Sequence, residues 1–416
     1  MSFTNFNFNN HISHGLKSHG YVTPTPIQNM AIQPLLDGRD LLGLAQTGTG
    51  KTAAFVLPIL QRLSSKPSAG SIRALIVAPT RELAEQTYAY IGKFSKCLKV
   101  HSCVIYGGVS KGTQINKLKR GVDIVIACPG RLLDLAHDGA IDLAGVDTLV
   151  LDEADQMLDQ GFLPDIKRII KMLPSRRQNL VFSATMPREI RSLVDKILVN
   201  PVEVAADYSR PVTNISHTFY KTDKKHKTSL LGSILKKEHV DSAIVFTRTK
   251  HKAKSLAQRL EKQGFKATSI QGNLSQQKRQ RALDGFKKGT YNILVATDIA
   301  ARGIDVAGIS HIINYDIPGT TEAYTHRAGR TGRANQSGEA VTFTTAEDFK
   351  MIKNLERALA GRLVYKNSAA YGTRDFILES GDIPRKRPAK GRTKPGKVRG
   401  KKSSQRNRMA AFDFGI

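Results

Sequence analysis

The sequence predicts an α/β protein with two tandem parallel-sheet domains followed by a disordered basic C-terminal tail. Three observations lead to this fold class. Short apolar runs alternate with longer segments of helical period, a polar stretch interrupts the alternation near the middle of the chain, and the last part of the chain has no apolar periodicity. The length of 416 residues fits two or three domains of about 100–200 residues each.

Five apolar runs mark the strands of the first domain, which we assign to residues 1–207. Leu, Ile and Val fill nearly every position of these runs, as is typical of strands buried on both faces of a parallel sheet. Helical segments between the runs imply βαβ units with right-handed crossovers. In chain order the runs are DLLGLA, RALIVAP, DIVIACP, TLVLDE and NLVFSAT.

A polar, proline-containing stretch, DYSRPVT, separates the first domain from a second one, which we assign to residues 208–368. The same alternation of apolar runs and helical segments restarts after it. A short joint of this kind permits motion between the domains. The predicted strands of the second domain are SAIVFTRT, KATSIQG, YNILVATD, HIINYD and EAVTFTT.

The remaining residues, 369–416, form the predicted tail. From Pro384 onward the tail has 12 basic residues and one acidic residue, without an apolar face that could pack on a core. Such a composition predicts disorder. The density of cations favours nonspecific nucleic-acid binding over a tail that only aids solubility.

The net charge of +29, from 64 basic and 35 acidic residues, indicates a polyanionic partner, either a nucleic acid or an anionic membrane. Residues 1–207 contribute +5, residues 208–383 contribute +13 and residues 384–416 contribute +11. The sequence contains no apolar run of about 18 residues, so it predicts no membrane span. Its N-terminus lacks the pattern of a secretory signal. The three cysteines form no C-x-x-C pair, which argues against a disulfide framework or a zinc site and favours the cytoplasm.

A phosphate-binding loop with the sequence AQTGTGKT follows the first predicted strand. Its glycines allow backbone N–H groups to turn toward phosphate oxygens, and the N-terminus of the next helix adds partial positive charge. We expect Lys51 to reach the β- and γ-phosphates and Thr52 to hold Mg²⁺. The predicted nucleotide-binding residues of the loop are Ala45, Gln46, Thr47, Gly48, Thr49, Gly50, Lys51 and Thr52.

Two acidic residues, Asp152 and Glu153, end a later predicted strand. The carboxyl ends of parallel strands meet at one edge of a sheet, so these carboxylates should lie beside the phosphate loop. Asp152 can hold Mg²⁺ through its water shell, and Glu153 can orient and deprotonate the attacking water. With Lys51, they predict a Mg²⁺-dependent NTPase.

The segment from Asp152 to Asp155 reads DEAD and resembles the motif that names the DEAD-box RNA helicases of superfamily 2. Further motifs follow in family order across residues 3–345. The resemblance implies two tandem RecA-like domains, ATP as the nucleotide, and a site that is completed when the two domains close. The short N-terminus and the basic tail are most similar to the bacterial RhlE type.

The segment GYVTPTPIQ, at residues 20–28, resembles the adenine-reading element of the family. The amide of Gln28 can pair with the donor and acceptor edge of adenine, and an aromatic ring can stack on the base. The resemblance adds Phe3 and Tyr21 to the predicted ATP-binding residues. Packing of the Phe-rich N-terminus is the alternative explanation for its rings.

The second domain carries two more motifs, HRAGRTGR at residues 326–333 and TDIAARGID at residues 297–305. The resemblance makes Arg330 and Arg333 arginine fingers, which neutralise charge on a γ-phosphate and join Lys51, Asp152 and Glu153 as the predicted catalytic set. It also makes Asp305 a ribose contact. The residues that it implies in coupling ATP to RNA are Ser183, Thr185, Arg302 and His326.

Loops after several predicted strands resemble the RNA-binding elements of the family. Hydroxyls, backbone amides and guanidinium groups suit phosphate and ribose and offer little base readout, so we expect binding that is largely independent of RNA sequence. Cys128 and Gln271 stand where the family usually has Thr and His, which leaves their RNA contacts open. The implied RNA-binding residues are Thr80, Arg81, Gly108, Arg131, Thr247, Arg248, Gly272 and Thr297.

Three functions are compatible with these motifs. The first is an ATP-dependent RNA helicase that locally unwinds short duplexes or remodels RNA–protein complexes. The second is a DNA translocase with the same motor, against which the PTPIQ and DEAD sequences argue. The third is an ATP-gated RNA clamp or assembly scaffold with little unwinding. We expect a monomer whose partners are RNA and proteins of ribosome assembly or RNA decay, with no membrane partner.

Overall fold

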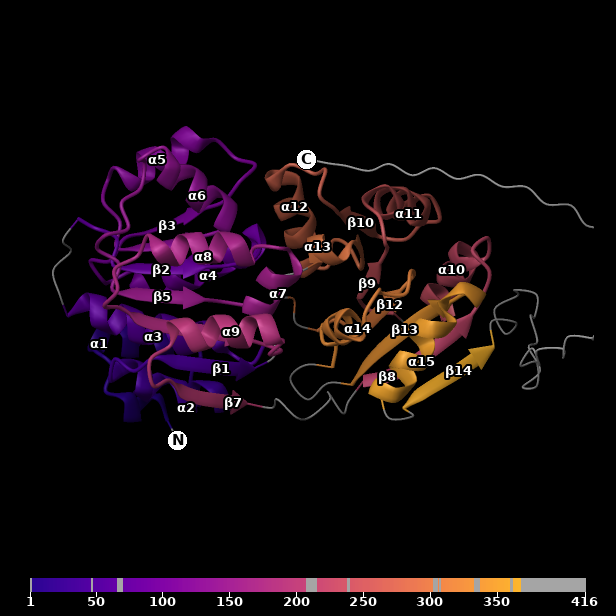
Figure 1. Ribbon diagram of the computed structural model, residues 1–416. Helices are drawn as coiled ribbons and strands as arrows, with labels where there is room; N and C mark the ends of the chain where they lie inside the picture. The colour runs from indigo at the N-terminus through magenta and orange to yellow at the C-terminus, as the bar shows by residue number, and fades with distance from the viewer. Residues whose placement is uncertain are drawn as a thin grey trace, which may run out of the picture. The chain divides into compact units, whose positions relative to one another are not determined.

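The computed structural model describes residues 2–45, 48–65, 70–206, 215–237, 240–301, 306, 308–332, 337–359 and 362–367. The chain divides into a unit spanning Met1–Asp375 and a second unit, Phe376–Ile416. The second unit, the whole predicted tail and the predicted joint at residues 207–213 lie outside the described residues. The described part contains two seven-stranded sheets (Figure 1).

The first sheet has the strand order β3-β4-β2-β5-β6-β1-β7, and every pair is parallel. All five predicted strands are present. β3 and β7 were not expected, because both are edge strands without a long apolar run: β3 begins at the half-buried Ser102, and β7 alternates exposed and buried residues. The strands are β1 (Leu41–Ala45), β2 (Ala74–Val77), β3 (Ser102–Ile105), β4 (Ile124–Ala127), β5 (Thr148–Leu151), β6 (Gln178–Ser183) and β7 (Val202–Ala206).

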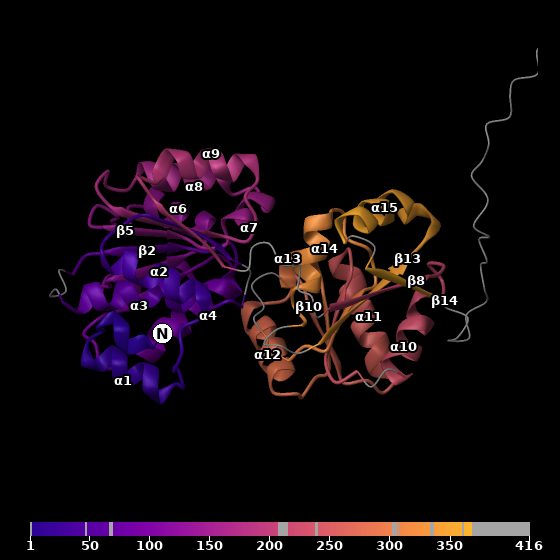
Figure 2. The same ribbon diagram turned by 90° about the horizontal axis from the view of Figure 1, so that it is seen from below.

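Helices cover both faces of this sheet, and we refer to the sheet with its helices (residues 2–206) as the first lobe (Figure 2). One buried cluster lies under α1 to α4, and a separate one lies under α6 to α9. The helices are η1 (Phe3–Phe6), α1 (Asn10–Ser18), α2 (Pro26–Leu36), α3 (Lys51–Ser64), α4 (Arg81–Ser95), α5 (Lys111–Leu118), α6 (Pro129–His137), α7 (Ala154–Asp159), α8 (Leu163–Lys171) and α9 (Arg188–Ile197).

The second sheet is also parallel throughout, with the order β10-β11-β9-β12-β13-β8-β14. The five predicted strands are again present. β8 and β14 were not expected, because polar residues interrupt their apolar positions. The strands are β8 (Ile215–Lys221), β9 (Ala243–Phe246), β10 (Ala267–Ile270), β11 (Ile293–Ala296), β12 (His311–Asn314), β13 (Gly338–Thr344) and β14 (Leu363–Asn367).

The second sheet and its helices (residues 215–367) form what we call the second lobe. Separate buried clusters again lie on the two faces of the sheet. Within the described part of the chain, no helix is both long enough and apolar enough to cross a membrane. The helices are α10 (Lys227–Lys237), α11 (Lys250–Lys262), α12 (Gln276–Lys287), α13 (Asp298–Ala301), α14 (Thr321–Ala328), η2 (Ala346–Asp348) and α15 (Phe349–Ala358).

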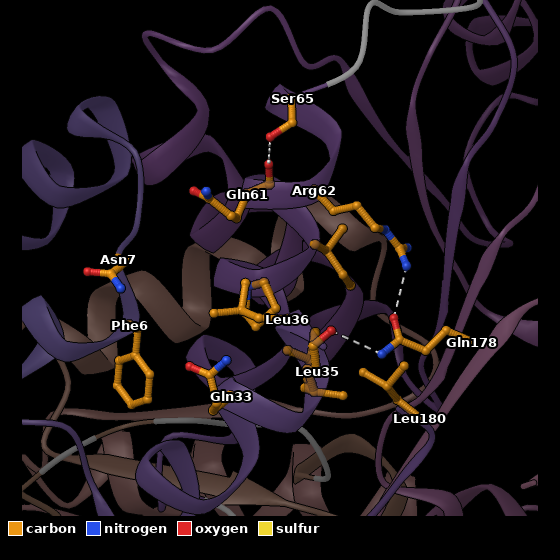
Figure 3. A pocket seen from close by; sticks show the side chains of 13 residues that line it. Phe6, Asn7, Gln33, Leu35, Leu36, Gln61, Arg62, Ser65, Gln178 and Leu180 are labelled. Atoms are coloured by element: carbon orange, nitrogen blue, oxygen red, sulfur yellow. Dashed lines mark hydrogen bonds between the residues drawn. The ribbon is translucent and has the colours of Figure 1, made fainter. Parts of the chain in front are cut away.

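A cavity of about 390 Å³ lies in the first lobe where α2 and α3 end and β6 begins (Figure 3). Gln178 closes one side by donating from Nε2 to the Leu35 carbonyl, 3.1 Å away, and accepts a hydrogen bond from Arg62 at 2.9 Å. Arg62 also pairs with Asp147 at 2.9 Å. These polar groups are already engaged with one another, so the cavity is part of the packing at the amino-terminal edge of the sheet.

Candidate functional site

The predicted nucleotide residues gather at the carboxyl edge of the first sheet. β1 leads into the phosphate loop, β5 leads to Asp152, and β6 ends at Ser183, and these three strands are neighbours in the sheet. Parallel pairing places all three strand ends on the same edge, as the sequence predicted. The fold therefore brings the loop and the acidic residues together.

The phosphate loop adopts the backbone conformation that its glycines allow. Gly48 has φ 90° and Gly50 has φ 95°, in the left-handed region that side chains other than glycine rarely adopt. Gly50 is also the N-cap of α3, whose first residue is Lys51. Gln46 and Thr47 lie outside the described residues.

Lys51 and Asp152 are buried polar residues at this edge, and their hydrogen-bonding groups are available to a ligand. Both side chains are buried, and neither Lys51 Nζ nor Asp152 Oδ1 has a hydrogen-bond partner among the described residues. Burial raises the pKa of Asp152, the positive charge of Lys51 lowers it, and the charge of Glu153 raises it; the net direction is upward. A buried polar atom without a partner costs free energy, so a phosphate at Lys51 and a hydrated Mg²⁺ at Asp152 fit the residues present.

Glu153 occupies a strained backbone position beside them. It is buried, it has φ 55° and ψ 55°, and it is the N-cap of α7. A non-glycine residue in this region costs about 1–3 kcal/mol, and such residues cluster at functional sites. The described residues contain no group of three or more His, Cys, Asp or Glu side chains arranged to hold a metal, whereas Mg²⁺ in nucleotide sites commonly uses one or two carboxylates and substrate phosphates.

The adenine-reading element is fastened to the phosphate loop through Gln28. Its Oε1 accepts from the Thr25 N–H at 3.0 Å, and its Nε2 donates to the Gly50 carbonyl at 3.1 Å. Phe3 is buried with its ring 6.1 Å from that of Tyr21, so packing accounts for its present contacts. The roles of Phe3, Tyr21 and Gln28 toward ATP remain predictions.

Asp155 links the acidic motif to the predicted coupling residues. Its Oδ2 accepts from the Thr185 N–H at 2.9 Å and from the Thr185 hydroxyl at 3.0 Å. Ser183 Oγ accepts from the Asp155 N–H at 3.2 Å and donates to the Thr185 carbonyl at 2.7 Å. His326 Nε2 lies 3.9 Å from Asp155 Oδ2. A change at Asp155 would therefore reach all three coupling residues that are described.

The arginine motif of the second lobe is only partly described. Arg330 is buried just after the end of α14. Arg333, Arg302 and Asp305 lie outside the described residues, so their roles remain predictions. Arg327, to which the motif alone assigned no role, is buried and bidentate to Asp298, with Nη2–Oδ2 at 2.7 Å.

Arg81 and Gly108 lie against each other in the predicted RNA track. Gly108 has φ 81°, and a Cβ added there would overlap the Arg81 guanidinium. The left-handed backbone therefore favours glycine here, and a larger residue would also displace the Arg81 guanidinium. Thr80 caps α4, with Oγ1 accepting from the Leu83 N–H at 3.3 Å, and its own side chain is buried.

The other predicted RNA residues differ in how much of the side chain is accessible. Arg131 Nη1 donates to the Val109 carbonyl at 3.3 Å. Thr247 is fully buried, and its hydroxyl donates to the Thr249 carbonyl at 3.3 Å. Arg248 and Gly272 are exposed, and Thr297 is half-buried. The RNA contacts of all these residues remain predictions.

The two departures from the family pattern now have a structural description. Burial raises the pKa of Cys128 to about 12, so its thiol stays protonated at the start of α6. Gln271 is buried, and its Oε1 accepts from the Asn273 N–H at 2.6 Å, which fixes the turn around Gly272.

A cavity of about 520 Å³ collects several of the predicted RNA residues within the Met1–Asp375 unit. Glu82 and Arg279, at its wall, form a buried ion pair at 2.7 Å. No sequence motif marks Arg279, because an isolated arginine on a helix gives no signal of such a contact. The cavity is lined by Thr80, Arg81, Gly107, Arg131, Gly272 and Arg279 among others.

Comparisons with known proteins agree with these motifs. The profile of the DEAD/DEAH box helicase family matches residues 25–193, and that of the helicase conserved C-terminal domain matches residues 226–335. The chain is 40% identical to the DEAD-box ATP-dependent RNA helicase CshA of Bacillus subtilis over 86% of this chain and 72% of that protein. It is also 40% identical to the DEAD-box ATP-dependent RNA helicase RhpA of Helicobacter pylori, with the same coverage of both chains.

Solved structures give the same result. Dbp5 of S. cerevisiae bound to RNA and ADP BeF3 aligns with a TM-score of 0.79 and 29% identity, covering 89% of this chain and 97% of that one. Mss116p bound to ssRNA and AMP-PNP aligns with a TM-score of 0.77 and 28% identity, covering 88% and 78%. The predicted tandem RecA-like fold is thereby confirmed. This chain belongs to the DEAD/DEAH box helicase family.

Proposed function

We propose that the protein is an ATP-dependent RNA helicase that locally unwinds short RNA duplexes or remodels RNA–protein complexes. The observation that carries the proposal is the buried edge at which Lys51 Nζ and Asp152 Oδ1, next to Glu153, have no hydrogen-bond partner among the residues that the structure describes. The names of the relatives and the RNA and nucleotide in the neighbouring structures support it.

In the proposed reaction the chain positions ATP and a water molecule. Lys51 binds the β- and γ-phosphate oxygens, and Thr52 and Asp152 hold Mg²⁺, which neutralises phosphate charge when it is bound. Glu153 orients the water and accepts its proton as the oxygen attacks the γ-phosphorus, while the bond from that phosphorus to the β–γ bridging oxygen breaks and ADP leaves. Arg330 and Arg333 stabilise the charge on the transferred group, and Asp305 contacts the ribose.

Coupling to RNA uses the contacts of Asp155. Because Asp155 holds Thr185 and Ser183, a rearrangement at the γ-phosphate would change the position of the β6–α9 segment. RNA held by the predicted track would respond to that change as the two domains close and reopen. Arg302 and His326 complete this coupling in the proposal.

RNA-stimulated ATPase activity tests the proposal. We expect single-stranded RNA to raise ATP turnover, with a smaller effect of DNA of the same sequence. Turnover that does not respond to RNA would rule the proposal out, and equal displacement of matched RNA and DNA strands would favour a translocase. The rate of RNA release can also be compared with the rate of ATP-driven unwinding that is expected of a helicase. Release that is far slower than this unwinding rate would favour the clamp or scaffold.

The remaining assignments are proposals of the same kind. We place the domain boundaries at residues 1–207, 208–368 and 369–416, and the protein in the cytoplasm as a monomer. Proteins of ribosome assembly or RNA decay are the proposed partners. The two bacterial relatives described above are named CshA and RhpA, so the RhlE subgroup stays a prediction.

A further inference from the structure

Asp316 is a buried carboxylate in the second lobe that no predicted motif includes. It lies two residues beyond the end of β12 and is 8% exposed. Its own N–H donates to the Phe246 carbonyl at the end of β9, at 3.2 Å. Asp316 therefore continues the pairing of β12 with β9 past the last residues of both strands.

The carboxylate reaches from this position to the turn after β9. Asp316 Oδ2 accepts a hydrogen bond from the Arg248 N–H at 3.0 Å. The same turn is held by the Thr247 hydroxyl, which donates to the Thr249 carbonyl, and by Thr249, which caps α11. The Arg248 side chain is exposed, whereas its backbone N–H is held by the buried Asp316 carboxylate.

Two lysines hold Asp316 in its ionised form. Lys252 Nζ lies 2.7 Å from Asp316 Oδ1, and Lys227 Nζ lies 3.6 Å from the same oxygen. Lys227 is buried and also donates to the Tyr315 carbonyl at 2.8 Å. Burial alone would raise the pKa of Asp316, but hydrogen bonds from Lys252 and the Arg248 N–H and the two lysine charges lower it. The acceptor is thus a charged, rigid group.

We infer that Asp316 is a positioning residue for RNA binding, which acts by holding the Arg248 turn in the conformation that presents its guanidinium to the RNA backbone. The inference rests on the proposed function. A long Arg side chain that starts from a fixed backbone loses less conformational freedom on binding than one on a loose turn. The alternative is that Asp316 serves only to neutralise Lys227 and so supports the stability of the lobe.

The test measures the RNA concentration that gives half-maximal ATPase stimulation, together with kcat and the KM for ATP, in the full-length protein. Loss of a hydrogen bond to a charged group weakens an equilibrium constant by a factor of roughly ten. We therefore expect Asp316→Ala to raise the half-maximal RNA concentration about tenfold. The kcat at saturating RNA and the KM for ATP should not change. Asp316→Asn keeps an oxygen for the Arg248 N–H and should lie between wild type and Asp316→Ala.

A double-mutant cycle with Arg248→Ala separates positioning from an independent effect. If Asp316 acts through Arg248, the double variant should need less RNA than the product of the two single effects predicts. Full multiplicativity would overturn the inference, as would an equal loss in the Asn and Ala variants or a loss confined to kcat. Glu347→Ala removes an exposed carboxylate of the same lobe, paired with Lys224, and is the matched control that should leave all three constants unchanged.

The outcomes distinguish this inference from the function on which it rests. A wild-type ATPase that RNA does not stimulate would contradict the proposed function itself. Normal RNA stimulation with an unchanged RNA requirement in Asp316→Ala would contradict only the positioning role. An RNA requirement raised by Asp316→Ala but not by Arg248→Ala would also reject that role, because the effect would not pass through Arg248.

Discussion

Glu153 combines burial, a left-handed backbone and a place next to Asp152, which together suit a base that must hold one orientation. Glu153→Gln keeps the size of the side chain and removes its ability to accept a proton. We predict that this variant still binds ATP and RNA but that its turnover falls by about 10²–10⁴-fold, the usual contribution of a general base. Single-turnover hydrolysis and equilibrium binding measure the two effects separately.

The matched control for this substitution is Glu189→Gln, which makes the same chemical change at an exposed position of α9. Its turnover should equal that of the wild type. Undiminished turnover in Glu153→Gln would remove Glu153 from its role as the base.

At the residue scale, the fold gathers the predicted nucleotide residues more clearly than the predicted RNA residues. Lys51 and Asp152 belong to motifs whose spacing follows from the chemistry of phosphate and Mg²⁺, and the fold places them on one edge. Thr247, by contrast, matched an RNA motif, yet its hydroxyl is turned inward. Asp316 was missed because its function depends on a neighbouring strand 68 positions away in the chain, which no local pattern reports.

At the scale of elements, β8 carries a buried histidine that should make the second lobe sensitive to acid. Burial, helped by the charge of Arg362, lowers the pKa of His217 to about 4. Its Nδ1 lies 2.9 Å from the Tyr324 hydroxyl of α14. The unfolded chain binds a proton at His217 below a pH of about 6.5, whereas the folded chain does so only near pH 4, so stability falls as the pH drops between these values.

We predict that His217→Gln, which cannot titrate, removes about 2–3 kcal/mol of the stability difference between pH 7 and pH 4. Hydrogen exchange of β8 and α14 amides in the full chain, compared at the two pH values, measures the effect. His251→Gln alters an exposed histidine of α11 and should leave the difference as it is in the wild type. An identical pH dependence in wild type and His217→Gln would show that His217 does not control it.

The sequence predicted the central strands of both sheets because burial on both faces requires continuous apolar runs. Four strands, β3, β7, β8 and β14, were missed for the converse physical reason, and three of them lie at a sheet edge. β7 needs apolar residues on one side only, and β8 contains His217 and Thr218, whose polar groups find partners inside the lobe. Strand pairing supplied by a neighbour, rather than local pattern, determines these segments.

At the scale of the whole molecule, the uneven charge predicts where RNA affinity depends on salt. Residues 384–416 contribute +11 to the net charge of +29. We predict that deletion of residues 384–416 weakens RNA binding and flattens the dependence of the logarithm of affinity on the logarithm of salt, since fewer counterions are released. Affinity measured from about 50 to 200 mM salt checks this prediction.

A full-length variant in which the basic residues of this segment are replaced by Ser and Gly is the control for chain length. It should behave like the deletion if charge is responsible. A salt dependence equal to that of the full chain would show that the tail acts on solubility and not on RNA.

The buried ammonium of Lys51 has a consequence for the lifetime of the protein. The Lys51 Nζ has no hydrogen-bond partner in the described part of the first lobe, so a nucleotide that binds there becomes a component of that lobe's stability, because any ligand that binds only the folded state adds to its free energy of unfolding. The ATP pool then acts on the protein twice, as fuel and as a protectant against proteolysis. In an energy-starved cell the abundance of this enzyme would fall together with its activity.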